Sequence, residues 1–287
     1  MPESASETYR DERLPILITV LVLGLALSAL VPLPTWEIIL ELFGSELALR
    51  FSGPIQSLIL LAILVCAGVD SLVRSNLARA PLKAEAQPSR RRPSGLAISA
   101  MFWPLPALIA ILGLVALQSM AWWGYRVGLA LGVGAAVAVI IVLQLATQSL
   151  YSTPRRGLRL VLNGVAYGIA YVLFSLIFGA RQRSLISGTA VLAVSGVLAL
   201  ELLRNTETAA WRPWLYAALL ALAMGQLTWV LNYTRLDNRT GGALLLLAFY
   251  VLTGLTQQYL WERLSRRVVA EYVVVLALGL GVIWLLL

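Results

Sequence analysis

Long apolar runs separated by short polar gaps dominate the sequence. Nine such runs, each 18 to 24 residues long, cover residues 14–33, 53–73, 96–118, 124–147, 158–178, 184–203, 213–233, 241–260 and 270–287. A helix needs about 20 apolar residues to cross a hydrocarbon core, whereas the strands of membrane barrels are about 10 residues long and alternate in polarity. The pattern therefore predicts an all-α bundle of about nine membrane-spanning helices.

The stretch 36–51 differs from these runs because Glu37, Glu41 and Glu46 interrupt it every four or five residues. In a spanning helix each glutamate would carry a penalty of about 2.5–3.5 kcal/mol on insertion scales. We therefore expect an amphipathic helix that lies in the membrane interface on the outer face. Its inward side would carry Ile38, Ile39, Leu42 and Phe43.

Composition agrees with this class of protein. Apolar residues make up 60% of the 287 residues and charged residues 13%, with a mean hydropathy of +0.84, whereas soluble domains average about 45–50% and about 25%. These values exclude a soluble enzyme, a disordered chain and a disulfide scaffold. We expect a polar, disordered tail over 1–13 and one transmembrane helical domain over 14–287, with a basic loop at 74–95.

The basic residues indicate an orientation. The chain has 22 Lys and Arg against 14 Asp and Glu, a net charge of +8. Sixteen of the bases lie in the N-terminal tail and in alternate gaps between the runs, and six lie in the remaining gaps. The positive-inside rule then places the N-terminus and the loop 74–95 in the cytoplasm and the C-terminus outside. The lipid bilayer is the expected partner, and nucleic acid is not, because there is no basic domain.

The usual groups for metal or catalytic chemistry are missing from the sequence. It has no histidine, and Cys66 is its only cysteine. No phosphate-binding loop or serine-hydrolase motif is present. We therefore expect no metal, no cofactor and no enzymatic activity.

Polar residues inside the apolar runs are the candidate site. These residues, which would all lie toward the cytoplasmic ends of five helices, are Asp70, Gln144, Asn163, Glu201 and Gln257. Polar groups at membrane depth are costly and suggest function. In that interpretation the five residues form one polar layer, and Glu201 is an unpaired, neutral acid. In the alternative, Asp70 pairs with Arg74 and Glu201 with Arg204 as ordinary helix-end ion pairs.

Two other sets of residues have a functional and a structural interpretation. Arginines in two short loops on the opposite side could bind an anion or a lipid headgroup, or could pair with Asp237; they are Arg181, Arg183, Arg235 and Arg239. Small residues four apart could form a sliding or dimerising surface, or serve ordinary tight packing. These rows are Gly124, Gly128, Gly132 and Ala136; Gly164 and Gly168; and Ala221 and Gly225.

The C-terminal third resembles a family of uncharacterised bacterial polytopic membrane proteins, a domain of unknown function. The residues that carry the resemblance are 183–187 (RSLIS), 241–247 (GGALLLL), 249–251, 254–255, 266–267 and 271–272, within a match over about 181–275. The resemblance implies a multi-pass protein of the bacterial inner membrane and brings no activity.

Two functions fit these observations. The first is a non-enzymatic bundle that serves as a subunit or as an assembly or stabilising component of a membrane complex, with other membrane-protein subunits as partners. The second is a secondary transporter of a small or amphipathic solute. Minimal loops, small-residue rows and the lack of catalytic motifs favour the first.

Overall fold

The computed structural model describes residues 3–30, 34–42, 45–79, 99–147, 156–180, 184–204, 211–234 and 236–286. The chain forms two compact units, Met1–Tyr151 and Ser152–Leu287, each described here by itself. The single transmembrane helical domain predicted over 14–287 stays a prediction, and the two units are the groups of helices within the chain that pack together. Hydropathy locates helices, but it does not say which helices pack against which.

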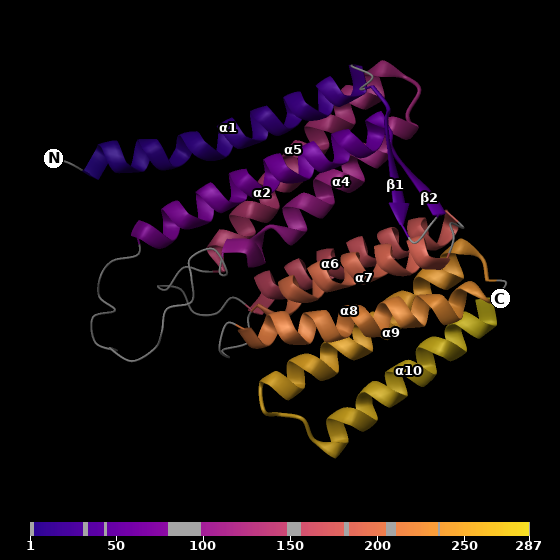
Figure 1. The fold of residues 1–287 in the computed structure, drawn as a ribbon. Helices are drawn as coiled ribbons and strands as arrows, with labels where there is room; N and C mark the ends of the chain where they lie inside the picture. Colours follow the sequence, from indigo (N-terminus) through magenta and orange to yellow (C-terminus); the bar gives the residue numbers. More distant parts are fainter. Residues whose placement is uncertain are drawn as a thin grey trace. The chain divides into compact units, whose positions relative to one another are not determined.

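The described part of the first unit is a bundle of four α-helices with a β-hairpin, whose course can be followed in Figure 1. The helices are α1 (Glu3–Leu30), α2 (Gly53–Arg79), α4 (Pro104–Ser119) and α5 (Trp123–Ala146), with a 3₁₀ turn η1 (Ala100–Phe102) before α4. Helix α1 packs against α2 and α5, and α4 packs against the same two helices. Fully buried side chains such as Leu21, Leu25, Val65, Leu114 and Val137 fill the centre of the unit.

Helix α1 begins well before its apolar segment. The prediction of a disordered tail over 1–13 is wrong, because the helix already starts at Glu3. The residues involved include several Glu and Arg, which have high helix propensity, so the helix continues beyond the apolar part. At the other end of the unit, Pro104 and Pro106 stand in the first turn of α4. Proline suits that position because its missing N–H has no partner there in any case.

The stretch 36–51 is a β-hairpin, so the amphipathic interfacial helix predicted there is wrong. Strand β1 (Trp36–Leu42) pairs antiparallel with β2 (Ser45–Phe51). In the register, Trp36 is opposite Phe51, Ile38 is opposite Leu49, and Glu37 is opposite Arg50. Figure 1 shows the strands running across the direction of α1 and α2.

A period of two explains the hairpin. Register positions 36, 38 and 40 and their partners 51, 49 and 47 are all apolar, and Leu42 is opposite Ser45 at the turn. On the other face, 37, 41, 46 and 50 are charged, around the apolar pair of Ile39 and Ala48. Residues alternate between the faces of a strand, so this is the pattern of an amphipathic hairpin. Because Glu37 and Glu41 are four residues apart, they also fit a helix. Over so short a stretch, periodicity does not distinguish the two.

The described part of the second unit contains five helices, whose course can be followed in Figure 1. They are α6 (Arg156–Gly179), α7 (Ser184–Leu203), α8 (Trp211–Asn232), α9 (Asn238–Leu260) and α10 (Arg266–Leu286). Helix α7 packs most extensively on α8, and α6 on α9. Phe174, Leu198, Met224, Leu245 and Phe249 are fully buried between these helices. Helix α10 lies at the edge of the unit against α9.

The helical bundle expected from the sequence is confirmed. The described residues hold nine α-helices, in the same order as the nine apolar runs. Seven of these helices are long and apolar enough to cross a membrane, and two further apolar helices are shorter, Leu14–Ser28 within α1 and Pro104–Ser119.

Candidate functional site

The five polar candidates fall into two groups, one in each unit. Asp70 on α2 and Gln144 on α5 belong to the first unit. Asn163 on α6, Glu201 on α7 and Gln257 on α9 belong to the second. The second unit thus holds three of the five candidates.

Glu201 forms a buried ion pair at the end of α7. Its Oε1 lies 2.9 Å from Nη1 of Arg204, and both side chains are only 4% exposed. The structure therefore shows the ion pair that was the alternative interpretation, and it contradicts the expectation of an unpaired, neutral acid. A carboxylate desolvated at this depth keeps its charge only if a cation accompanies it, and Arg204, three residues on, reaches back over the last turn.

Burial and two neighbouring charges influence the ionisation of Arg204. Burial lowers the pKa of the Arg204 guanidinium, while the Glu201 carboxylate raises it. The positive charge of Arg159, near the start of α6, also lowers this pKa. The start of α6 and the end of α7 thus bring two arginines and one glutamate within electrostatic range.

Gln257 connects α9 to the same turn. Its Nε2 donates a hydrogen bond of 2.9 Å to the backbone oxygen of Leu202. The last four carbonyls of a helix have no partner within the helix, so an amide side chain from a neighbour can satisfy one of them. Gln257 therefore lies beside the turn that carries Glu201, as the sequence predicted, but it bonds to the backbone.

Asn163 lies at the same level of the bundle on α6. Helices α6 and α9 are antiparallel neighbours, and the hydroxyls of Tyr167 and Thr253 are 3.1 Å apart. Asn163 is one turn before Tyr167, and Gln257 is one turn after Thr253. In an antiparallel pair these two residues face the same level. The half-buried Asn163 and Gln257 thus share one level of the α6–α9 pair.

A tyrosine cluster next to these residues was missed by the sequence interpretation. The ring centroids of Tyr167 and Tyr250 are 5.5 Å apart, and those of Tyr250 and Tyr272 are 6.0 Å apart. Gly254 makes room for Tyr272, because a Cβ there would overlap the tyrosine ring. Arg159, Asn163 and Tyr167 follow one another at intervals of four, so the sequence places Tyr167 on the polar face of α6. This spacing does not indicate that Tyr250 and Tyr272 join it.

In the first unit, Asp70 ties α2 to the turn before α4. Its Oδ2 is 2.8 Å from Nε of Arg74, and its Oδ1 accepts a hydrogen bond of 2.5 Å from the hydroxyl of the fully buried Ser99. The i,i+4 pair is the alternative that the sequence offered. Gln144 is 1% exposed within the helix bundle.

Of the four candidate anion-binding arginines, only Arg239 lies within the described residues. Arg181, Arg183 and Arg235 lie outside them. Arg239 is exposed in the first turn of α9, where Asp237 is the N-cap and accepts a hydrogen bond of 3.2 Å from the amide of Thr240. Hydrogen bonds from Thr240, first from its side chain and then from its backbone, hold the pKa of Asp237 below its ordinary value.

The small-residue rows have different fates. A Cβ on Gly225 of α8 would lie 3.2 Å from Cβ of Leu192 and 3.3 Å from the carbonyl oxygen of Gly188 on α7, so this row is ordinary tight packing. By contrast, positions Gly128 and Gly132 on α5, and Gly164 and Gly168 on α6, are open. Among the described residues, no heavy atom lies within 4 Å of a Cβ built at any of these four glycines.

A family of proteins of unknown function, DUF5656, matches residues 33–286. The chain belongs to the DUF5656 family. The resemblance inferred over about 181–275 is thereby confirmed and extended toward the N-terminus. No curated protein and no solved structure matches the chain.

The DUF5656 match contains the polar candidates of both units, the tyrosine cluster and the open glycines. It begins after α1, which ends at Leu30. No group of three or more potential metal ligands occurs among the residues whose positions the structure describes. What the second-unit arrangement can do is hold helix ends together through charge and amide contacts.

Proposed function

We propose that this DUF5656 protein is an integral, multi-pass protein of a bacterial inner membrane with its N-terminus in the cytoplasm. In that membrane it serves as a non-enzymatic subunit or stabilising component of a larger complex. Seven helices long and apolar enough to span a bilayer support insertion. The excess of Arg in the tail and alternate loops supports the orientation.

The observation that carries the proposal is the contrast between engaged polar groups and open small residues. Tyr167 bonds to Thr253, Gln257 bonds to the α7 backbone, and Glu201 is paired. The glycines of α5 (Gly128, Gly132) and α6 (Gly164, Gly168) instead leave the helix backbone open. Hydrophobic burial drives no association between helices in lipid, so close backbone approach at small residues is a main source of affinity. An open glycine row is therefore where a partner helix fits.

The experiment is co-purification from native membranes with a tagged chain in mild detergent. We expect a second membrane protein at a constant ratio to the chain. Gly132→Leu should reduce that ratio, because the new side chain holds the partner helix away. Val127→Phe is the matched control, since Val127 is 43% exposed on the same helix but outside the row. A monodisperse chain without a partner, or equal loss in both variants, contradicts the proposal.

A second candidate function is a secondary transporter of a small or amphipathic solute, a carrier. It draws support from the polar side chains along the α6–α9 contact, from Asn163 and Gln257 to the Tyr167–Thr253 hydrogen bond. A carrier works as a purified protein. The purified chain is placed in liposomes that contain a pH-sensitive dye, and a fluorescent amphipathic cation is added outside. Entry of the cation, or a change of internal pH coupled to it, would report transport. Tyr167→Phe should lower the rate of this transport. Flux equal to that of empty liposomes contradicts this candidate and leaves the subunit proposal intact.

A further inference from the structure

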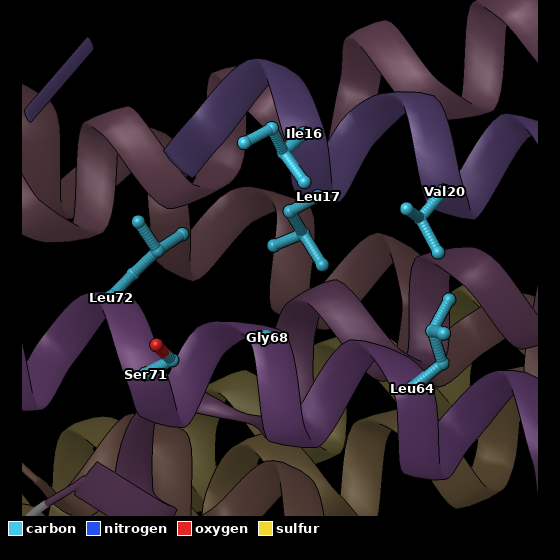
Figure 2. Close-up of a pocket in the computed structure, with 7 residues that line it drawn as sticks. All are labelled: Ile16, Leu17, Val20, Leu64, Gly68, Ser71 and Leu72. Atoms are coloured by element: carbon cyan, nitrogen blue, oxygen red, sulfur yellow. The ribbon is translucent and has the colours of Figure 1, made fainter. Parts of the chain in front are cut away.

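An apolar notch opens between α1 and α2, with a volume of about 280 Å³. Figure 2 shows its lining, which comes from both helices: Ile16, Leu17, Val20, Leu64, Gly68, Ser71 and Leu72. Ile16 is 59% exposed and Val20 40% exposed, so the notch opens on the outside of the unit. Ser71 contributes the only polar side chain of this lining.

Gly68 lets α1 and α2 approach closely within the notch. A Cβ at Gly68 would overlap the side chain of Leu17, so the two helices approach closely at this point. In Figure 2, Leu17 points from α1 toward Gly68 on α2, and Val20 lies beside it further along α1. Leu17 takes up the space at Gly68, and the notch is the space left between the lining side chains of the two helices.

The position of the notch relates it to a membrane surface. The apolar part of α1 begins at Leu14, and the spanning segment of α2 ends at Ser75. The notch covers the first turns of the former and the last turns of the latter. If these helices span a bilayer, the notch lies just inside the hydrocarbon boundary, where phospholipid chains leave their headgroups.

We propose that this notch holds one acyl chain of a phospholipid whose phosphate lies at the end where α1 begins and α2 ends. The inference rests on the proposed membrane insertion. An α-helix with its side chains is about 10–12 Å across, and one turn of it exceeds the volume of the notch. A linear hydrocarbon chain, part of which would lie in the notch, matches its apolar lining.

The helix ends supply a reason for the phosphate. By helical spacing, Arg13 is one turn before Leu17 on α1, and Arg79 is two turns after Ser71 on α2. Arginine is charged at every physiological pH, and its forked donors match phosphate oxygens. A lipid with its chain in the notch would thus extend its phosphate toward two arginine positions.

The test uses the full chain in phosphatidylcholine vesicles that contain a trace of phosphatidylcholine with a photoreactive diazirine in one acyl chain. Labelled residues are mapped by mass spectrometry. We expect labelling concentrated at the notch residues relative to Leu23 and Ile63, which are 57% and 60% exposed on the same helices outside the notch. Diacylglycerol with the same diazirine chain should lack this enrichment, because it has no phosphate.

Two variants fill the notch from opposite helices, Ser71→Phe and Val20→Phe, and each should abolish the enrichment. The matched control Ile63→Phe should retain it. Gel filtration reports whether each variant still folds. Even labelling of notch and control positions overturns the notch site while membrane insertion stands. Labelling of no helix overturns insertion itself, and equal enrichment with diacylglycerol overturns the role of the phosphate.

Discussion

The side-chain amide of Gln257 donates a hydrogen bond of 2.9 Å to the backbone oxygen of Leu202, which joins α9 to the last turn of α7. The contact satisfies a carbonyl that a helix end leaves without an intrahelical partner. It also places Gln257 beside the ion pair of Glu201 and Arg204. Helices α7 and α9 therefore depend on one another at this end of the second unit.

Gln257→Leu should lower the free energy of unfolding by about 0.5–1.5 kcal/mol, because the Leu202 carbonyl loses its partner. Unfolding of the detergent-solubilised protein, followed by tryptophan fluorescence, measures the change. Gln226→Leu is the matched control, since Gln226 is exposed on α8. If the two variants have the same stability, the hydrogen bond contributes nothing.

Breaking the buried ion pair of Glu201 and Arg204 should lower the free energy of unfolding by more than the loss of the Gln257 hydrogen bond. Arg204→Met leaves the Glu201 carboxylate desolvated without its cation, and we expect a loss of about 3–5 kcal/mol in the free energy of unfolding. Glu201→Gln should destabilise the protein as well, and the double variant Glu201→Leu/Arg204→Met should recover much of the loss.

The comparison for this pair is Arg74→Met in the first unit. The Arg74 side chain is 49% exposed beside Asp70, and a pair of that kind contributes about 1 kcal/mol or less. Equal losses at Arg74 and Arg204 would show that burial does not strengthen the Glu201 pair.

Glycine substitutions should separate packed from open rows. Gly225→Leu inserts a side chain against Leu192 and the Gly188 backbone, and overpacking of this kind costs about 1–3 kcal/mol. Gly168→Leu points into open space within the described residues and should stay within about 0.5 kcal/mol of the parent. Denaturant titration in mixed micelles measures both, and a reversed order would mean that the α7–α8 contact is not made as described.

The N-cap of α9 should respond to acid. The pKa of Asp237 is lower in the folded state than in the unfolded chain. Its stabilising effect is therefore complete above the unfolded pKa and is lost as the pH falls through the folded pKa. Amide exchange at the start of α9 should speed up relative to the rest of the helix as the medium is acidified. Asp237→Asn keeps a capping side chain but does not titrate, so this acid-dependent component should disappear.

Topology is the remaining prediction. A reporter that is active only in the cytoplasm should work when fused after Arg92 and fail when fused after Leu287, because the basic loops are expected inside. A reporter that is active only outside should give the opposite pattern. Activity of the cytoplasmic reporter at both positions would mean an even number of crossings between them, which contradicts the nine-helix arrangement.

Much of the helical architecture could be predicted from the sequence. Runs of about 20 apolar residues have few alternatives in a polypeptide, because every backbone N–H and C=O must be satisfied where water is absent. The pairs Asp70–Arg74 and Glu201–Arg204 were foreseeable as well, because residues three and four apart in a helix are neighbours. The order of the nine helices and the family resemblance could also be inferred from the sequence.

Only the tertiary structure decided the remaining features. Glu37 and Glu41 fit either a helix or a strand, and pairing with 45–51 selects the hairpin. Small residues follow the same spacing on α5, α6 and α8. Among the glycines of these rows, only Gly225 is in close contact with a neighbouring helix. The hydrogen bond between Tyr167 and Thr253 joins residues 86 positions apart. Spacing along one helix determines which residues share a face, whereas contacts between distant segments depend on how whole helices pack.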